Sequence, residues 1–159
     1  MEIIAVLAVV SVGLLGVLTL VIQNIQIQFI NKNALIASQL AQEGLELVRA
    51  KRDTNWLLKN SWNDSITPGN YIIDAMNTWQ NGIVDINNPE AKLYIQGFGG
   101  IESFAHTTTS YPTNFRRLIT IQDLVAGQSL KIISTAQYEQ GGNKYQYVAE
   151  TDLYNWGER

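Results

Sequence analysis

Residues 2–23 read EIIAVLAVVSVGLLGVLTLVIQ, and this stretch decides how the chain is organised. A single carboxylate, Glu2, stands directly before residues 3–22, which carry no charge. At a helical rise of ~1.5 Å per residue, residues 3–22 extend over roughly 30 Å, about the thickness of the hydrocarbon core of a bilayer. The segment is therefore predicted to be able to cross a membrane. Glu2 needs its own explanation, because a carboxylate is costly in lipid.

Two familiar kinds of segment compete for this stretch. A secretory signal peptide has basic residues before an apolar run of roughly 7–15 residues and a small-residue cleavage site after it. Here no Lys or Arg precedes the run, and the helical pattern continues beyond it, so a signal peptide is disfavoured. An ordinary membrane anchor accounts for everything in the segment except Glu2.

Beyond the apolar run, residues 29–53 (FINKNALIASQLAQEGLELVRAKRD) indicate an amphipathic continuation of the same helix, which we expect to end near Asp53. Apolar residues recur at steps of three and four, the spacing of one helical face. This stripe, expected to pack on the rest of the chain, comprises Ile30, Ala34, Ala37, Ala41, Leu45 and Val48. A second stripe of Ile36, Leu40 and Leu47 lies on a different face and is predicted to meet a partner.

Gly13 and Gly16 interrupt the apolar segment. Small residues in a membrane helix allow close helix packing, and each Gly also lowers helix stability by up to about 1 kcal/mol. The stretch IQNIQIQ at residues 22–28 is a second weak part of the helix.

The remainder of the chain is predicted to be a β-rich head. Turn signals, with Pro68-Gly69 the strongest, precede short strand candidates at residues 82–86 and 92–96. Three longer runs of β-forming residues, 115–123, 129–139 and 144–156, are separated by VAGQ and GGN and predict an antiparallel meander. The fold class is therefore α+β, with a long N-terminal helix packed on a C-terminal antiparallel sheet. The expected divisions are residues 1–28 (apolar half-helix), 29–53 (amphipathic half-helix) and 54–159 (head).

The head shows little catalytic chemistry. The chain has no cysteine, and its one histidine, His106, lies in the polar stretch AHTTTSYP, which favours a surface position over a ligand role. The aspartates lack the spacing of a calcium loop, and neither a Gly-x-Ser-x-Gly elbow nor a phosphate-binding loop is present. We therefore expect no enzyme activity, no cofactor and no metal site.

Charge is divided unevenly between the two parts of the chain. Residues 1–53 are neutral, and the head carries the whole net charge of −3. An acidic head disfavours nucleic-acid binding. Arg116 and Arg117 form its basic doublet; as neighbours on a strand they are predicted to point to opposite faces, in solvated positions.

The order of these parts resembles the bacterial type IV pilins and type II secretion pseudopilins. Residues 2–18 (EIIAVLAVVSVGLLGVL) are similar to the N-terminal segment of that family. LAQEGLELVRAKRDTNW (40–56) and YVAETDLYNW (147–156) are similar to the helix end and final strand of a pilin subset from small bacterial genomes. Residues 57–114 carry no such resemblance.

The resemblance implies a role for Glu2. In pilins a Glu near the mature N-terminus is thought to neutralise the N-terminal amine of the adjoining subunit inside an apolar filament core. That role carries over to Glu2, with Met1 as the corresponding amine donor. The family usually starts its mature chain with Phe and places the Glu a few residues further in. The position of Glu2 directly after Met1 therefore implies either unusual processing or a short stretch upstream.

The resemblance further implies a major pilin that packs with copies of itself. Such a subunit resides in the cytoplasmic membrane before the pilus assembly machinery moves it into an extracellular filament. Gly13, Gly16 and the Ile36, Leu40 and Leu47 stripe are the other assembly candidates. The polar TTTSYP loop suits an outward-facing shell. A minor pilin or pseudopilin, and a lone membrane-anchored surface-binding domain, are the alternatives.

Overall fold

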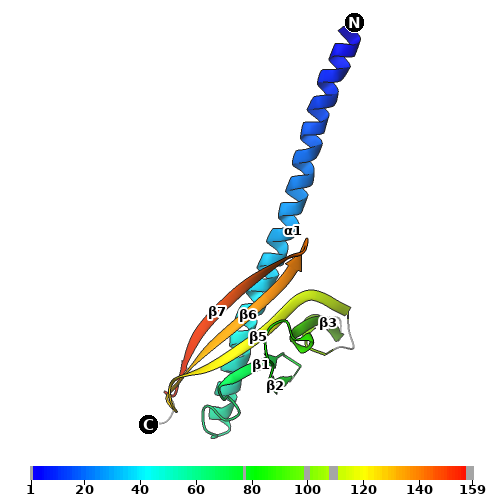
Figure 1. Ribbon diagram of the computed structural model, residues 1–159. Helices are drawn as coiled ribbons and strands as arrows, with labels where there is room; N and C mark the ends of the chain where they lie inside the picture. Colours follow the sequence, from blue (N-terminus) through cyan, green and yellow to red (C-terminus); the bar gives the residue numbers. More distant parts are fainter. Residues whose placement is uncertain (1, 77, 99–100, 108–110, 157–159) are drawn as a thin grey trace. The chain divides into compact units, whose positions relative to one another are not determined.

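The computed structural model describes residues 2–76, 78–98, 101–107 and 111–156 (Figure 1). The chain divides into two compact units, Met1–Leu35 and Ile36–Arg159. The first unit is helical, and the second combines the rest of that helix with a sheet. The boundary between these units, after Leu35, lies between the predicted boundaries at residues 28 and 53, and the predicted divisions remain predictions. The α+β fold class is confirmed, with one long helix and a seven-stranded antiparallel sheet.

Helix α1, Glu2–Leu57, is unbroken over 56 residues and ends four residues beyond the predicted Asp53. Its end is fixed by the loop that follows rather than by the run of charges. The Asn55 side chain is buried and donates to the carbonyl oxygens of Trp62 (3.2 Å) and Asp64 (2.8 Å). Lys59 then takes the left-handed conformation, with φ of 60°, that commonly ends helices.

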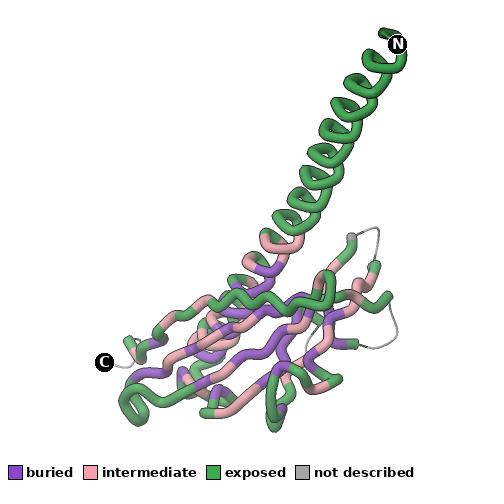
Figure 2. Tube along the Cα trace, turned by 45° about the horizontal axis from the view of Figure 1, so that its top comes forward, coloured by how far each residue is buried: buried purple, intermediate pink, exposed green. Residues whose placement is uncertain are grey.

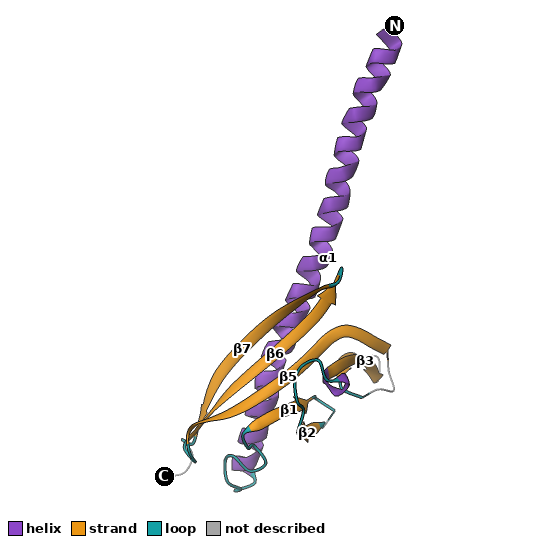
Figure 3. Ribbon diagram, viewed as in Figure 1, coloured by secondary structure: helices purple, strands orange, loops and turns teal. Residues whose placement is uncertain are grey.

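In the part of the chain that the structure describes, seven strands and one 3₁₀ turn follow α1, and Figure 3 shows them by type. Their bounds are β1 Gly69–Ile73, β2 Trp79–Asn81, η1 Pro89–Ala91, β3 Lys92–Phe98, β4 Ile101–Ala105, β5 Tyr111–Val125, β6 Ser129–Gln140 and β7 Asn143–Tyr154.

Strand β5 organises the sheet. Along one side it pairs with β6 from Phe115↔Tyr138 to Val125↔Ser129, and β6 pairs in turn with β7. Along its other side, the two halves of β5 pair with different strands, β1 and β3. The predicted antiparallel meander is therefore confirmed as β5, β6 and β7. The 92–96 candidate is confirmed within β3.

The predicted strand at residues 82–86 is wrong. The short strand β2 ends at Asn81, and Gly82, with φ of 90°, turns the chain out of the sheet. Ile83 and Ile86 are apolar because they join a small buried cluster with Leu118 and its neighbours, not because they belong to a strand. Apolar alternation alone does not distinguish these two situations.

The main core lies between the second unit's part of α1 and one face of the sheet. Figure 2 shows buried residues gathered along this part of the helix and the strands beneath it. Four residues of the predicted stripe are buried there: Ala37, Ala41, Leu45 and Val48. Ile30 and Ala34 belong to the first unit and are not buried; Ile30 is 36% exposed.

Gly44 is a point of close approach between α1 and the sheet. A Cβ at this position would collide with the Ser134 hydroxyl on β6 and would lie 3.2 Å from the end of the Ile119 side chain on β5. The helix can therefore lie this close to the sheet only because residue 44 has no side chain.

We expect residues 24–159, without the apolar run, to form a soluble monomer, because the core lies in residues 36–159. Size-exclusion chromatography with light scattering, together with an NMR spectrum, checks this. A control fragment beginning at Gly44 lacks Ala37, Leu40 and Ala41 and should fail to fold. An unfolded or obligately oligomeric longer fragment would contradict the division into units.

Gly44→Leu should destabilise the head by about 1–3 kcal/mol, because overpacking pushes the helix away from the sheet. Urea unfolding of the full chain in detergent micelles, followed by tryptophan fluorescence, gives the measurement. Gly16→Leu is the matched control, since a Cβ at Gly16 meets nothing within 4 Å in the described chain. Equal unfolding midpoints for the two variants would contradict the close approach.

Candidate functional site

In the first unit, residues 3–22 present an apolar surface without charge, and Glu2 lies at its end. By length and composition α1 could cross a membrane, and its most apolar stretch is wholly exposed. The two hydroxyls in this stretch are already bonded within the helix: Ser11 donates to the Leu7 carbonyl (2.7 Å) and Thr19 to the Leu15 carbonyl (2.9 Å). These two hydroxyls therefore need no hydrogen-bond partner from whatever covers the surface.

Glu2, Gly13 and Gly16 all lie on this surface. Glu2 is exposed in the first turn of α1, where a carboxylate is favourable to the helix dipole. A Cβ at Gly13 or Gly16 would meet nothing within 4 Å in the part of the chain that the structure describes, so no contact there requires a glycine. Met1 lies outside the described residues. The roles of these four residues in assembly stay predictions.

The second predicted stripe does not form a free face. Leu40 is only 2% exposed and belongs to a core cluster with Leu93, Phe115 and Tyr138. Ile36 is partly buried and packs against this cluster, whereas Leu47 is partly buried against a second core cluster that contains Leu45 and Val48. Leu40 is thus unavailable to a partner. The line of contact between α1 and the sheet runs between the two stripes, so residues of both are buried. Only the exposed parts of the Ile36 and Leu47 side chains remain for the predicted contact with a partner.

Arg117 is completely buried, so its predicted solvated position is wrong. One terminal nitrogen donates to the Ile73 carbonyl (2.6 Å); the other donates to the Leu40 carbonyl (3.3 Å) and lies 3.3 Å from the Glu43 carboxylate. Burial lowers the pKa of Arg117, and the Glu43 charge opposes that change. The signal was present in the sequence, because strand alternation places Arg117 on the same face as Phe115 and Ile119.

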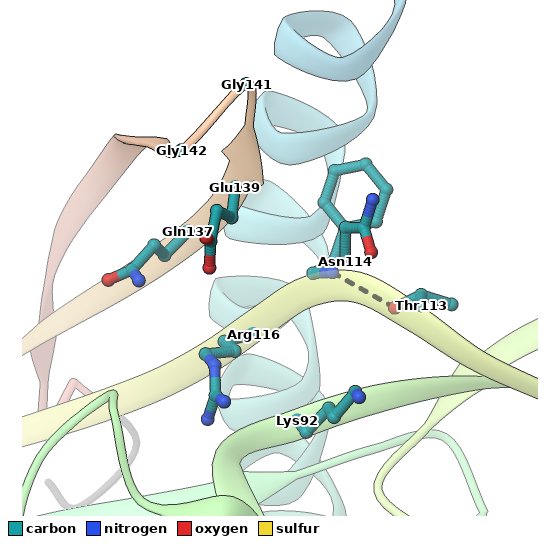
Figure 4. Close-up of a pocket in the computed structure, with 9 residues that line it drawn as sticks. Lys92, Thr113, Asn114, Arg116, Gln137, Glu139, Gly141 and Gly142 are labelled. Atoms are coloured by element: carbon teal, nitrogen blue, oxygen red, sulfur yellow. Dashed lines mark hydrogen bonds between the residues drawn. The ribbon is translucent and has the colours of Figure 1, made fainter.

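Arg116 points to the other face, as the alternation predicts. It donates to the backbone carbonyls of Asn87 (3.1 Å) and Asn88 (2.9 Å) and is half-buried. Beside it is a groove of about 390 Å³ (Figure 4). Lys92, Gln137 and Glu139 line this groove with Arg116, under the Gly141-Gly142 turn. Both cationic and anionic groups face it, so its charge favours no single ligand class.

His106 is also buried, contrary to the surface position predicted for it, and is 7% exposed. Its Nδ1 lies 3.1 Å from the Glu90 carbonyl oxygen and 3.2 Å from that of Lys92. Because carbonyl oxygens only accept, Nδ1 carries the proton of a neutral ring. The polar neighbours of His106 in the sequence misled the prediction, since its contacts come from Asp74, Glu90 and Lys92, which lie elsewhere in the chain.

Asp74 joins these elements. One carboxylate oxygen accepts the backbone N–H of His106 (2.8 Å), and the other accepts those of Met76 (2.9 Å) and Thr78 (3.0 Å). Burial opposes ionisation of Asp74, but these hydrogen bonds outweigh it and lower its pKa below the usual value. Asp74 therefore acts as a buried, ionised support for the loop between β1 and β2.

These titratable groups lack the arrangement of a metal site. Within the described ranges, no three His, Cys, Asp or Glu side chains form a group that could hold a metal ion. Arg117 is held by Glu43, and Asp74 is occupied by backbone N–H groups. The expectation of a non-enzyme stays a prediction.

Comparisons with protein-family models, with curated proteins and with solved structures find no match to this chain. The architecture itself is pilin-like, since a long N-terminal helix packs on an antiparallel sheet. An architecture does not by itself establish a family or a function.

The buried His106 makes head stability depend on pH. Burial, followed by the Arg117 charge, lowers its pKa to about 4 from an ordinary value of 6.5. Below pH 6.5, His106 binds a proton in the unfolded chain but stays neutral in the folded head. The free energy of unfolding of the head therefore falls as the pH drops towards 4. We expect a loss of about 3 kcal/mol over this range.

Urea unfolding of the full chain in micelles across this pH range measures the effect. His106→Gln should lower stability at neutral pH yet remove most of the loss on acidification. The lowered pKa of Asp74 adds a further loss only at still lower pH, as that carboxylate becomes protonated. An unchanged pH profile in the His106→Gln variant would contradict this assignment.

Proposed function

We propose that this chain is a structural subunit of a type IV pilus-like extracellular filament. The observation that supports this most is the dual nature of α1. Its residues 37–48 contribute buried side chains to the core of the head, while residues 3–31 of the same helix are uncharged and exposed. In a subunit of this kind, the apolar half of the helix lies in the membrane before assembly and then packs against the same half-helix of other copies.

The physical basis is the need to cover the apolar half-helix in every state. Exposed apolar surface on this scale is unfavourable in water and marks a region that contacts lipid or protein. The cytoplasmic membrane covers it before assembly, and neighbouring subunits cover it afterwards. Head-to-tail contacts of this sort do not close on themselves, so they produce a fibre.

Glu2 gives this assembly its specificity. Inside a core of packed apolar helices a carboxylate is tolerable only when it is paired. The partner we propose is the N-terminal amine of an adjoining subunit. Pairing would hold the new subunit in register while it leaves the membrane with the help of the pilus assembly machinery.

A major subunit is favoured among the filament roles because the polar TTTSYP loop suits an outward-facing shell. Thr107, Tyr111 and Pro112 are exposed; the rest of the TTTSYP loop lies outside the described residues. A minor pilin or a pseudopilin has the same plan and is the first alternative. The second is a lone membrane-anchored domain that binds a surface ligand, which would have no use for Glu2.

Glu2→Ala separates the filament from the lone anchor. Removing one partner of a buried ion pair costs roughly 3–5 kcal/mol, so filament yield should fall steeply while the membrane-bound subunit keeps its level and its folded head. Filaments sheared from cells and membrane-bound subunit are both quantified, and the N-terminal residue of each is identified by mass spectrometry.

The control is Glu102→Ala, which removes an exposed carboxylate from β4 in the head and should leave filament yield unchanged. Equal filament yield for Glu2→Ala and the wild type would remove the charge-pairing role. Absence of filaments even in the wild type would instead favour the membrane-anchored domain.

A further inference from the structure

A cavity of about 370 Å³ opens on the head where α1 ends beside the last part of the chain. We call it the tryptophan notch; Arg52, Asp53, Trp56, Leu57 and Trp156 line it. Four of these residues come from the last turns of α1 and the fifth follows β7. All lie in the second unit, so the notch belongs to the head alone.

The two indole rings of the notch meet at an angle. Their centroids are 4.5 Å apart and their planes are inclined by 65°. The Arg52 guanidinium lies over the Trp56 ring, 4.7 Å from its centroid, so Trp56 is packed from two directions. Trp156, in contrast, is 68% exposed. It offers a rigid apolar ring surface that the core of the head does not use.

The polar rim of the notch is already oriented. Arg52 approaches the same Asp53 carboxylate oxygen with two nitrogens, Nε and Nη2, each at 2.9 Å. This pair fixes the guanidinium over Trp56 and leaves the second Asp53 oxygen as an acceptor at the edge. The remaining N–H groups of Arg52 are donors. A fixed acceptor and fixed donors thus stand beside an exposed indole.

We propose that the tryptophan notch binds a neutral saccharide. One face of a pyranose ring carries C–H groups and stacks on Trp156, while hydroxyl groups at its edge donate to Asp53 and accept from Arg52. The cavity volume suits one or two sugar rings, and such sites combine apolar walls with a few placed polar groups. Binding of this kind adds a recognition function to the proposed structural one and does not depend on assembly.

Other ligand classes fit the notch less well. A phosphate or carboxylate would approach the Asp53 charge as well as Arg52, and like charges repel. A purely apolar segment, such as the N-terminal helix of a second copy, would cover the Arg52–Asp53 pair without replacing its lost hydrogen bonds to water. A saccharide satisfies the apolar ring and the polar rim together.

Ligand-observed NMR titration of the full chain tests this proposal. The protein is held in micelles of a zwitterionic detergent, because maltoside or glucoside head groups would compete for the notch. The probes are methyl glycosides of glucose, galactose, mannose and rhamnose, with N-acetylglucosamine and N-acetylgalactosamine. We expect saturable binding of at least one of them.

Three variants locate the binding. Trp156→Ala should lower the affinity for the sugar by about tenfold or more, since it removes the stacking surface. Asp53→Asn should weaken it by less, because an amide oxygen still accepts a hydrogen bond. Tyr111→Ala is the control and should have no effect, because Tyr111 is an 81% exposed aromatic residue that does not line the notch.

Failure of every probe to saturate would overturn the proposal, and so would binding that is unaffected by Trp156→Ala. Loss of filaments in Trp156→Ala without any sugar binding would identify a second copy as the occupant and would also overturn it. Glu2→Ala should bind sugar like the wild type, so failure of the filament proposal and failure of the saccharide proposal are distinguishable.

Discussion

The close approach of α1 to the sheet at Gly44 is the constraint on which the rest of the head depends. Because residue 44 has no side chain, Ala41, Leu45 and Val48 can reach the inward faces of β5 and β6. The same proximity lets Arg117 span the gap, from the Leu40 carbonyl and Glu43 on the helix to the Ile73 carbonyl at the end of β1. A buried cation is tolerable there because several acceptors surround it. Arg117 on β5 therefore connects the helix, the meander and β1.

Patterns with a regular period predicted much of this fold. The meander follows from three runs of β-forming residues separated by turn residues, and the helix face follows from spacing of three and four. The errors arose where non-local contacts decide. Ile83 and Ile86 lie in a loop yet join a buried cluster with Leu118. His106 is held by residues distant in the sequence, and Leu40 joins the core because the helix packs on the sheet between its two stripes. Of the candidate site, the apolar surface with Glu2 was visible in the sequence. The tryptophan notch was not, since it joins the end of α1 to residue 156.

The two units of the chain meet different physical requirements with one helix. The head's part of α1 buries one face and places charged residues elsewhere, as soluble helices do. From residue 3 to residue 22 the helix of the first unit is apolar all round, and its two hydroxyls bond to its own backbone, as is usual for a helix in lipid. No loop separates the two kinds of surface, so the transition occurs within a few turns of regular helix.

The contact between the head's part of α1 and the sheet also determines how the head would bear a mechanical load. Tension on this part of α1 enters a helix that is regular up to Leu57. It reaches the sheet through side chains spread from Ala37 to Val48, which would have to slide past β5 and β6 together rather than separate one after another. Shear of this kind distributes force over many contacts. The Arg117 hydrogen bonds to the Leu40 and Ile73 carbonyls add a polar link across the same sliding interface.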